Sequence, residues 1–525
     1  MKKLRLIWIV LMAVIFFSCS DSGPTNPDPG ENGGEEPASE KQFVWDAMNY
    51  WYYWQGDVPE LADDYFENDD EFFSYLNGFN TSEDVFNSLL YQDDDFSFFI
   101  DDYEEYQDER DGVYAALGFN YGFVYISDTE LMGYVRYVIP NSPADDAGLK
   151  RLDLFTEVDG TTITENNYLS LLTSDSEHEL TMVHLERTDD GFTIVEDSTA
   201  TVASEEVVED PVLKTEIIDT SGVKIGYISY NAFRDNYHSR LNGVFGEFKS
   251  ENIEELVLDL RYNGGGSVLT SQLLSSLISG YGSSDEYAEL SYNDKRSSRS
   301  RDLYFLDEVP LQNDEGEFEQ DNEGNFINSE PMNNLSLSSL YVLTSRSTAS
   351  ASEAVINSLN PYIDVTVIGL KTVGKDEGSL TLYDASPPYL DDSDANPDHK
   401  KAIQPIVSKI LNSVGEAYPD GFTPDGYDPN ANQGSGGCVD DNNDNCVNEI
   451  TINNLIERPA LGSPDEPLLA RAIAIITGQI TKQKSSSVEA NYPKLHEIEM
   501  INGMQDLRPN GNGMYLEPFM MPKED

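Results

Sequence analysis

The chain is poor in cysteine, histidine and basic residues, and these shortages restrict what it can do. Its 525 residues contain 3 Cys, 5 His and 32 Lys plus Arg, against 96 Asp plus Glu, for a formal net charge of −64. Phosphate backbones repel such a polyanion, so nucleic acid is a poor partner, and anionic lipid surfaces are disfavoured for the same reason. Hydrophobic residues still make up 39% of the chain, which is enough to bury a sizeable core in several domains.

Catalysis by histidine has little support in the sequence. None of the five histidines sits in a motif, and we expect each to be structural or solvated: His178, His184, His238, His399 and His496. A catalytic serine in this chain would therefore need a base other than imidazole.

Long apolar runs are also rare, and the one that stands out is Leu6–Phe17. It follows the basic residues Lys2, Lys3 and Arg5 and is shorter than the ~20 residues of a comfortable transmembrane helix. It ends in Phe17-Ser18-Cys19, which resembles a bacterial lipobox. We predict a lipoprotein signal peptide over 1–19, lipidation of Cys19 and a flexible acidic tether over 20–40. The alternative is an ordinary secretory peptide with an incidental cysteine.

The two remaining cysteines lie close together in a polar stretch. In an exported protein, Cys438 and Cys446 are expected to form a disulfide. A calcium site is the weaker interpretation, because the glycine expected at the sixth position of an EF-hand loop is absent. Its candidate oxygen ligands are Asp440, Asn442, Asp444 and Glu449. We expect a solvated acidic loop here, with no metal and no cofactor in the protein.

Composition and periodicity divide the rest of the chain into four parts. Aromatic residues recur at roughly helical spacing after Phe43 and predict a small helical domain over 41–111, with the aromatic stripe as its core. Short strands predict a small β domain over 112–205. Strands alternate with helices over 206–482, which predicts a layered α/β domain with polar surface insertions near 307–334 and 384–449. Residues 483–525 remain as a C-terminal extension.

A serine at a strand-to-helix junction is the first candidate for chemistry. Ser350 follows the strand-like LYVLTS and precedes the helix-like AVINSL. At that junction, unpaired backbone amides favour developing negative charge. The alternative is helix capping, because Ser350 and Glu353 also fit a capping box.

Two further segments complete the pattern. Lys375 follows the strand-like VTVIGL, and a buried lysine has a lowered pKa that suits a general base. The segment Asp259–Gly266 ends a strand with three consecutive glycines, which let backbone amides approach a substrate. Taken alone, the lysine could be solvated and the glycines a tight turn.

Together the three segments resemble the C-terminal processing, or tail-specific, serine proteases. In that family a DLRxNxGG strand end, a SASASE-like segment and a GK follow in this order, with 25 residues from serine to lysine, as from Ser350 to Lys375 here. The resemblance implies a layered, crotonase-like protease core, Ser350 as nucleophile and Lys375 as its base. The further roles that it implies are an oxyanion hole from Gly264, Gly265 and Ala351, and support from Glu353 and Thr372.

The chain departs from the family at one functional position. Where the family often has a glutamine, four residues after the lysine, this chain has Ser379. Either the Ser379 hydroxyl or Gln404, in the strand-like AIQPIV, could replace it in orienting the base.

The middle region resembles a bacterial PDZ domain. Leu117, Gly118 and Phe119 correspond to its carboxylate-binding loop, which would capture a peptide C-terminus by pairing along a sheet edge. A second departure falls here, because the family's Gly-Asp is Leu152-Asp153 in this chain.

These features predict a lipid-anchored serine endopeptidase of the bacterial cell envelope, held at the outer membrane on its periplasmic or surface face. Its PDZ-like domain would capture exposed C-terminal tails of polypeptides and deliver them to Ser350. The alternative is a peptide-binding lipoprotein of the same fold with weak or no catalysis, which Ser379 in place of glutamine would favour.

Overall fold

The computed structural model describes residues 37–172, 176–188, 191–428, 438, 445–479, 496–497 and 514–521. The predicted signal peptide, Cys19 and most of the predicted tether lie outside these ranges. Within them, no helix is both long enough and apolar enough to cross a membrane.

A five-stranded sheet forms the centre of the largest domain. Its strands, in spatial order, are β10 (Val212–Thr220), β11 (Val223–Tyr230), β12 (Glu255–Asp259), β17 (Ser339–Thr344) and β18 (Asp364–Gly369). All neighbours run parallel except β10 and β11. Alternate strand residues face opposite sides, so Leu256 and Leu258 join one hydrophobic cluster while Val257 joins another.

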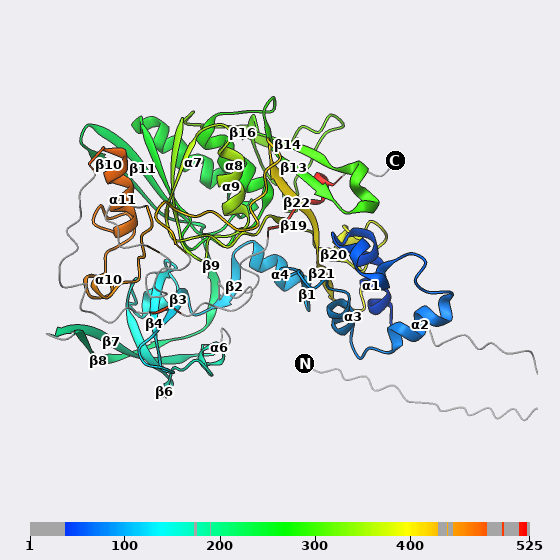
Figure 1. Ribbon diagram of the computed structural model, residues 1–525, viewed down its shortest axis with the longest axis horizontal. Helices are drawn as coiled ribbons and strands as arrows, with labels where there is room; N and C mark the ends of the chain where they lie inside the picture. The colour runs from blue at the N-terminus through cyan, green and yellow to red at the C-terminus, as the bar shows by residue number, and fades with distance from the viewer. Residues whose placement is uncertain are drawn as a thin grey trace, which may run out of the picture.

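Helices cover both faces of this sheet (Figure 1). Three helices pack on the Leu258 face, namely α7 (His238–Glu251), α8 (Val268–Ser279) and α9 (Ala351–Leu359). The other face is covered by α11 (Pro467–Ile476), through Leu468 and Leu469. The predicted layered α/β core is therefore confirmed.

Two smaller sheets extend the core. One has the order β14 (Arg301–Tyr304), β13 (Glu286–Tyr292), β22 (Ile406–Asn412) and β19 (Glu377–Ser379); the other has β1 (Phe98–Ile100), β21 (Ala402–Gln404) and β20 (Leu382–Tyr383). The prediction that 384–449 is a surface insertion is therefore wrong for β21 and β22, whose Gln404 and Val407 are buried. The strand-like AIQPIV falls within the predicted insertion because long polar stretches flank it on both sides. The 307–334 insertion contains the hairpin β15 (Glu308–Pro310) and β16 (Ser329–Pro331).

The N-terminal region is helical, as predicted, but it does not have a core of its own. Its helices are α1 (Ser39–Trp51), α2 (Asp69–Asn77), α3 (Ser82–Ser88) and α4 (Tyr103–Arg110). Met48, Trp51 and Tyr52 of the aromatic stripe are buried in the same cluster as Leu273 of α8. Strand β1 also pairs with β21 of the core. The stripe thus packs this region onto the α/β core.

The β domain contains one long sheet and a short connection to the core. Its strands, in spatial order, are β3 (Phe119–Tyr125), β4 (Leu131–Val138), β5 (Leu154–Val158), β7 (His178–Thr188) and β8 (Gly191–Val202), and β6 (Thr161–Thr162) pairs with β5. Strand β23 (His496–Glu497) adds to the free edge of β3. The ribbon of β2 (Val113–Ala116) and β9 (Glu205–Val208) leads to the core.

Short helices complete the described chain. They are α5 (Pro143–Asp146), α6 (Tyr168–Leu171), α10 (Ile452–Glu457) and the 3₁₀ turns at Gln55–Asp57, Pro59–Leu61, Asp235–Tyr237, Asp294–Arg299, Asp392–Asp394 and Pro518–Met520.

Leu152, which takes the place of the family's glycine, has a backbone conformation that glycine favours. Its φ is 63°, in the left-handed region that glycine adopts at little cost. Its side chain is buried in a cluster with Ile452 and Leu455 of α10. This packing offsets a backbone strain of roughly 1–2 kcal/mol.

Candidate active site

The carboxylate of Glu353 links the segments that carry Ser350 and Lys375. Its Oε2 atom accepts hydrogen bonds from the backbone amides of Ser350 at 2.8 Å and Lys375 at 2.9 Å. Its Oε1 atom accepts from Thr372 Oγ1 at 2.5 Å and from the Gly374 amide at 2.7 Å. One side chain of α9 therefore fixes both predicted catalytic residues at the backbone.

Glu353 is fully buried, and its surroundings suit the ionised form. Burial raises its pKa to about 7, and the hydrogen bonds from Thr372, Ser350, Lys375 and Gly374 oppose that rise. Three of the four partners are backbone amides, which can only donate, so these contacts favour the ionised carboxylate.

Ser350 lies at the N-terminus of α9 with a strained backbone and a buried hydroxyl. Its φ of 66° and ψ of −119° lie outside the regions common for L-residues, at a cost of roughly 1–3 kcal/mol. Glu353 accepts from the Ser350 amide, as in a capping box. The Oγ atom of Ser350 is buried, yet it has no hydrogen-bond partner among the described residues. No Oγ–Nζ hydrogen bond to Lys375 is therefore formed in this structure.

Gly265 lies directly against Ser350. A Cβ at Gly265 would sit 2.7 Å from Ser350 Cβ and 2.8 Å from its Oγ, and the φ of Gly265 is +120°. The Gly265 amide donates to Asn263 Oδ1 at 2.9 Å, so the prediction that this amide faces an oxyanion is wrong. In the described part of the chain, the amides of Gly264 and Ala351 have no hydrogen-bond partner and remain candidates.

The strand end 260–263 supports the loop that precedes Ser350. The Ala349 amide and the Ser352 hydroxyl both donate to the Asn263 carbonyl, at 3.2 and 3.1 Å. Thr348 Oγ1 donates to the Leu260 carbonyl at 2.8 Å. The DLRxNxGG and SASASE-like segments, separate in sequence, are thus hydrogen-bonded to one another.

Lys375 is buried, and burial lowers its pKa to about 8, although nearby Glu377, Asp94 and Glu353 oppose the shift. Its Nζ atom lies 4.7 Å from the centroid of the Phe96 ring. Desolvation of this kind is what a lysine base requires near neutral pH.

The N-terminal region supplies that apolar cover. Asp94 accepts hydrogen bonds from the amides of Phe96 at 3.0 Å and Ser97 at 2.9 Å, and from Tyr52 Oη at 2.7 Å. Asp94 thereby holds the loop in which Phe96 contacts Lys375. Sequence reasoning missed both residues, because no local motif marks them.

Ser379 and Gln404 are neighbours, and they form one chain of hydrogen bonds. Gln404 Nε2 donates to Ser379 Oγ at 2.9 Å, while Gln404 Oε1 accepts from Thr381 Oγ1 at 2.7 Å. Ser379 Oγ in turn donates to the Met514 carbonyl at 2.7 Å. Gln404 thus positions Ser379, and the Ser379 proton is directed at the C-terminal segment.

A buried network of charged side chains joins the α/β core to the β domain. Arg261 donates to Glu449 at 2.7 Å and to Glu466 at 2.5 Å, and it pairs with Asp259 at 2.8 Å. Glu449 also accepts from Arg151 of the β domain at 2.7 Å. The two arginines lower the pKa of Glu449 to about 2 against the effect of burial.

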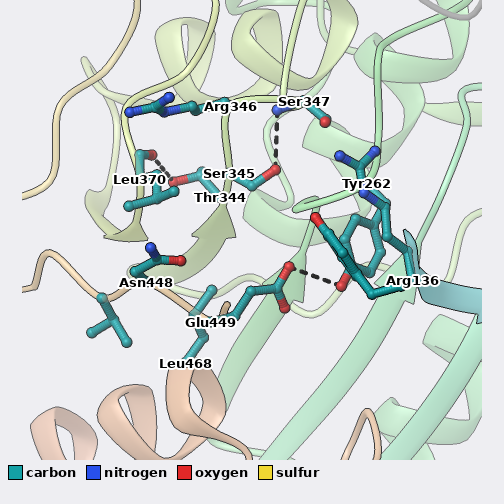
Figure 2. A pocket seen from close by; sticks show the side chains of 12 residues that line it. Arg136, Tyr262, Thr344, Ser345, Arg346, Ser347, Leu370, Asn448, Glu449 and Leu468 are labelled. Carbon is teal, nitrogen blue, oxygen red and sulfur yellow. Dashed lines mark hydrogen bonds between the residues drawn. The ribbon is translucent and has the colours of Figure 1, made fainter. Parts of the chain in front are cut away.

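A small pocket opens beside the network (Figure 2). Figure 2 shows Glu449 directed at Tyr262, whose hydroxyl donates to it at 2.8 Å. Ser345 and Ser347, from the loop before Ser350, line the pocket together with Arg136 of the β domain. The β domain therefore meets the core next to the loop that positions Ser350.

The predicted carboxylate-binding loop lies at the start of β3. Leu117 and Phe119 are buried, and Gly118 has a φ of +87°. A Cβ at Gly118 would lie 2.2 Å from Ser142 Oγ, so the loop requires glycine there. Ser142 Oγ donates to the Gly118 carbonyl at 3.0 Å and fixes the turn.

Cys438 and Cys446 are joined in a disulfide. Asp440, Asn442 and Asp444 lie outside the described residues, while Glu449 is engaged by Arg151 and Arg261. Among the described residues, no cluster of three or more His, Cys, Asp or Glu side chains is placed to hold a metal ion.

Four histidines have described side chains, and each has a hydrogen-bond partner. His178 contacts Asp159, His184 contacts Asp197, His238 contacts Thr270 and His399 contacts Asp384. His496 lies in β23, where only the backbone pairing is described.

Comparisons with known proteins agree with this architecture. Residues 224–387 match the model of peptidase family S41, and residues 39–98 match the peptidase S41 N-terminal domain. The chain thus carries a peptidase S41 domain and a peptidase S41 N-terminal domain. No curated protein sequence matches the chain.

One solved structure has a similar fold. The chain is similar to a Bacteroides fragilis protein described as an S41 protease, with a TM-score of 0.60 and 27% identity over 83% of this chain and 97% of that one. It also matches the photosystem II D1 C-terminal processing protease, with a TM-score of 0.42 and 20% identity over 74% of this chain and 92% of that one.

Proposed function

We propose that the protein is a serine endopeptidase in which Ser350 and Lys375 act as a dyad. The observation that carries the proposal is the shared carboxylate oxygen, because Glu353 Oε2 holds the backbones of both residues. The environment of each residue adds support. Ser350 Oγ makes no competing hydrogen bond within the described residues, and Lys375 is buried with a lowered pKa.

The reaction begins when the neutral Lys375 amine takes the proton of Ser350 as Oγ attacks the scissile carbonyl. The amides of Gly264 and Ala351 stabilise the resulting oxyanion. The Lys375 ammonium then gives its proton to the leaving amine as the C–N bond breaks, which leaves an acyl-enzyme. Water attacks the ester, Lys375 accepts the proton of that water, and the proton returns to Ser350 Oγ as the acid product leaves.

The β domain selects substrates by their C-termini in this proposal. The loop Leu117–Phe119 receives the terminal carboxylate, and the peptide pairs with the edge of β3. The partners are polypeptides with exposed C-terminal tails. The chain is anchored through lipid at Cys19 to the bacterial cell envelope, and it meets the membrane through that anchor alone.

A pair of peptide substrates tests the assignment. Wild-type protein is expected to cleave an unstructured peptide with a free C-terminus faster than the same peptide with an amidated one. Ser350→Ala is expected to abolish cleavage of both. Unchanged cleavage by Ser350→Ala would overturn the role of Ser350, and equal rates for the two peptides would overturn C-terminal capture alone.

A second candidate function is peptide binding without turnover. It is favoured by Ser379, which stands where the family often has glutamine and whose hydroxyl donates to Met514. In that case peptides with free C-termini bind through Leu117–Phe119, and no acyl-enzyme forms at Ser350.

A further inference from the structure

A short piece of the C-terminal extension lies as a strand beside the active site. The Tyr515 amide donates to the Gly266 carbonyl at 3.2 Å, and the Val268 amide donates to the Tyr515 carbonyl at 3.0 Å. Gly266 follows Gly265, which contacts Ser350. One edge of residues 514–516 is therefore paired with the loop next to the predicted nucleophile.

The other edge is paired with the strand that follows Lys375. The Ser379 amide donates to the Met514 carbonyl at 2.9 Å, and the Leu516 amide donates to the Ser379 carbonyl at 3.0 Å. Ser379 Oγ donates to the same Met514 carbonyl. Residues 514–516 thus fill a slot one strand wide between the Ser350 side and the Lys375 side of the site.

In the described part of the chain, no other strand pairs with these two edges of the slot. Each wall is already paired on the edge that faces away from residues 514–516. Gly266 is bridged to Phe233 there, and β19 is paired with β22. Without residues 514–516, both walls would present unpaired main-chain groups about two strand spacings apart, or roughly 10 Å. An extended peptide of almost any sequence could satisfy them, which is how β-augmentation recognises peptides.

Side chains fix this particular segment in the slot. Tyr515 Oη donates to Asp235 at 2.9 Å, and the Arg110 guanidinium lies 3.6 Å from the centroid of the Tyr515 ring. Glu517 pairs with Arg110 at 3.4 Å. Met514 and Leu516 are buried in the main hydrophobic cluster.

The same extension also covers a second peptide edge. Strand β23 pairs antiparallel with β3, with His496 opposite Tyr125 and Glu497 opposite Val124. This is the edge that follows Leu117–Phe119, where the proposed function places a substrate tail.

We propose that the C-terminal extension is an intramolecular, substrate-like inhibitor: residues 514–516 occupy the peptide slot between Gly266 and Ser379 and must leave before a substrate strand can pair there. The inference rests on the proposed peptidase function. A tethered competitor acts at an effective concentration on the order of millimolar, so it would suppress weak substrates without any further contact.

A shortened chain that ends at Gly513 tests the inhibitor. We expect it to cleave β-casein, an unstructured protein, at least about tenfold faster than the full chain, because the tethered competitor is gone. A synthetic peptide of residues 511–521 should then inhibit it competitively. The matched control is the same peptide N-methylated at Tyr515, which lacks the N–H that donates to Gly266 and should inhibit far less. Equal rates for the two folded chains, or activation by the added peptide, would overturn the inference.

Hydrogen exchange on the unaltered full chain tests it without truncation. A detachable segment opens locally, so the amides of Leu516 and Val268 should exchange well before that of Val257 in the central sheet. Exchange of all three only through global unfolding would show a permanent strand and overturn the inference.

Failure of the proposed function would look different. One outcome would overturn the peptidase assignment alone: neither chain cleaves β-casein, but the shortened chain binds a fluorescein-labelled 511–521 peptide. The slot would then still be supported as the binding site of the C-terminal segment. If that peptide did not bind the folded shortened chain, the inference itself would fall.

Discussion

The ammonium group of Lys375 lies 4.7 Å from the centroid of the Phe96 ring, across the contact between the core and the N-terminal region. A lysine that is desolvated in this way loses its proton more readily than one in water. The N-terminal region, which matches the S41 N-terminal domain, therefore bears directly on the state of the proposed base.

The first prediction concerns the pH dependence of activity. Burial lowers the pKa of Lys375 to about 8, and only the neutral amine can accept the proton of Ser350. Peptide hydrolysis should therefore rise with pH and reach half of its plateau near pH 8, falling about tenfold per pH unit well below it. A pH profile of kcat/KM checks this, and a plateau already complete at pH 6 would contradict it.

Removing the Phe96 ring should shift that profile. In Phe96→Ala, water reaches Lys375 and its pKa moves back up toward the ordinary value. The rising limb of kcat/KM should then move to higher pH by the same amount, while the plateau changes less. Phe96→Leu keeps an apolar cover and serves as the control. An unshifted limb in Phe96→Ala would show that the ring does not set the lysine pKa.

Glu353→Gln should disrupt both proposed catalytic residues at once. The glutamine side chain keeps one acceptor oxygen and turns its NH2 group toward the donors at the other oxygen position, either Ser350 and Lys375 or Gly374 and Thr372. At least one buried backbone donor is then left unpaired, at about 1–3 kcal/mol. We expect kcat to fall by roughly 10²-fold, because a small displacement of dyad groups is costly.

Thr372→Val provides the comparison for Glu353→Gln. It removes a hydroxyl that donates to Glu353 Oε1 and leaves the Oε2 bonds to Ser350 and Lys375 in place. Thr372→Val should therefore lower kcat less than Glu353→Gln does. Equal losses in the two variants, measured on protein of matched thermal stability, would argue against the shared oxygen as the key contact.

Gly265→Ala should block the site by contact. The added Cβ would lie 2.7 Å from Ser350 Cβ, and the φ of +120° strains any side chain there. We predict loss of activity by at least about 10²-fold. Gly415→Ala is the control for backbone strain. Gly415 also has a positive φ, +79°, but a Cβ there would have no atom within 4 Å, so this variant introduces strain without a steric contact. Activity kept by Gly265→Ala would contradict the geometry.

The buried charge network makes a prediction about stability. Arg261→Met would leave Asp259, Glu449 and Glu466 facing one another with less positive charge, and it should destabilise the fold by about 3–5 kcal/mol. The comparison is Arg458→Met, which breaks a partly exposed pair with Asp153 and should cost about 1 kcal/mol or less. Chemical denaturation of both variants measures the difference, and similar losses would refute the role of the network.

The sequence predicted those features that are carried by local patterns. Alternating strands and helices indicated the layered core, and the ordered motifs indicated the segments that Glu353 and Asn263 join in the structure. Leu152, which departs from the family's glycine, has a left-handed backbone, and its packing against α10 compensates the strain.

What the sequence could not predict depends on contacts between distant residues. The cover of Lys375 by Phe96, and the pairing of Arg151 and Arg261 with Glu449, join segments that share no periodicity or motif. The slot strand 514–516 is also too short to show alternation. The oxyanion prediction failed at Gly265 because an Asn263 side chain two residues earlier captures that amide.

Site-specific labelling tests the central claim most directly. The protein is incubated with a fluorophosphonate probe across pH 6 to 10, and the modified residue is mapped by peptide mass analysis, with Lys375→Ala in parallel. The account predicts labelling at Ser350 that rises through about pH 8 and is lost in Lys375→Ala. Labelling of Ser350 that is equally fast in Lys375→Ala, or that falls on another serine, would contradict it.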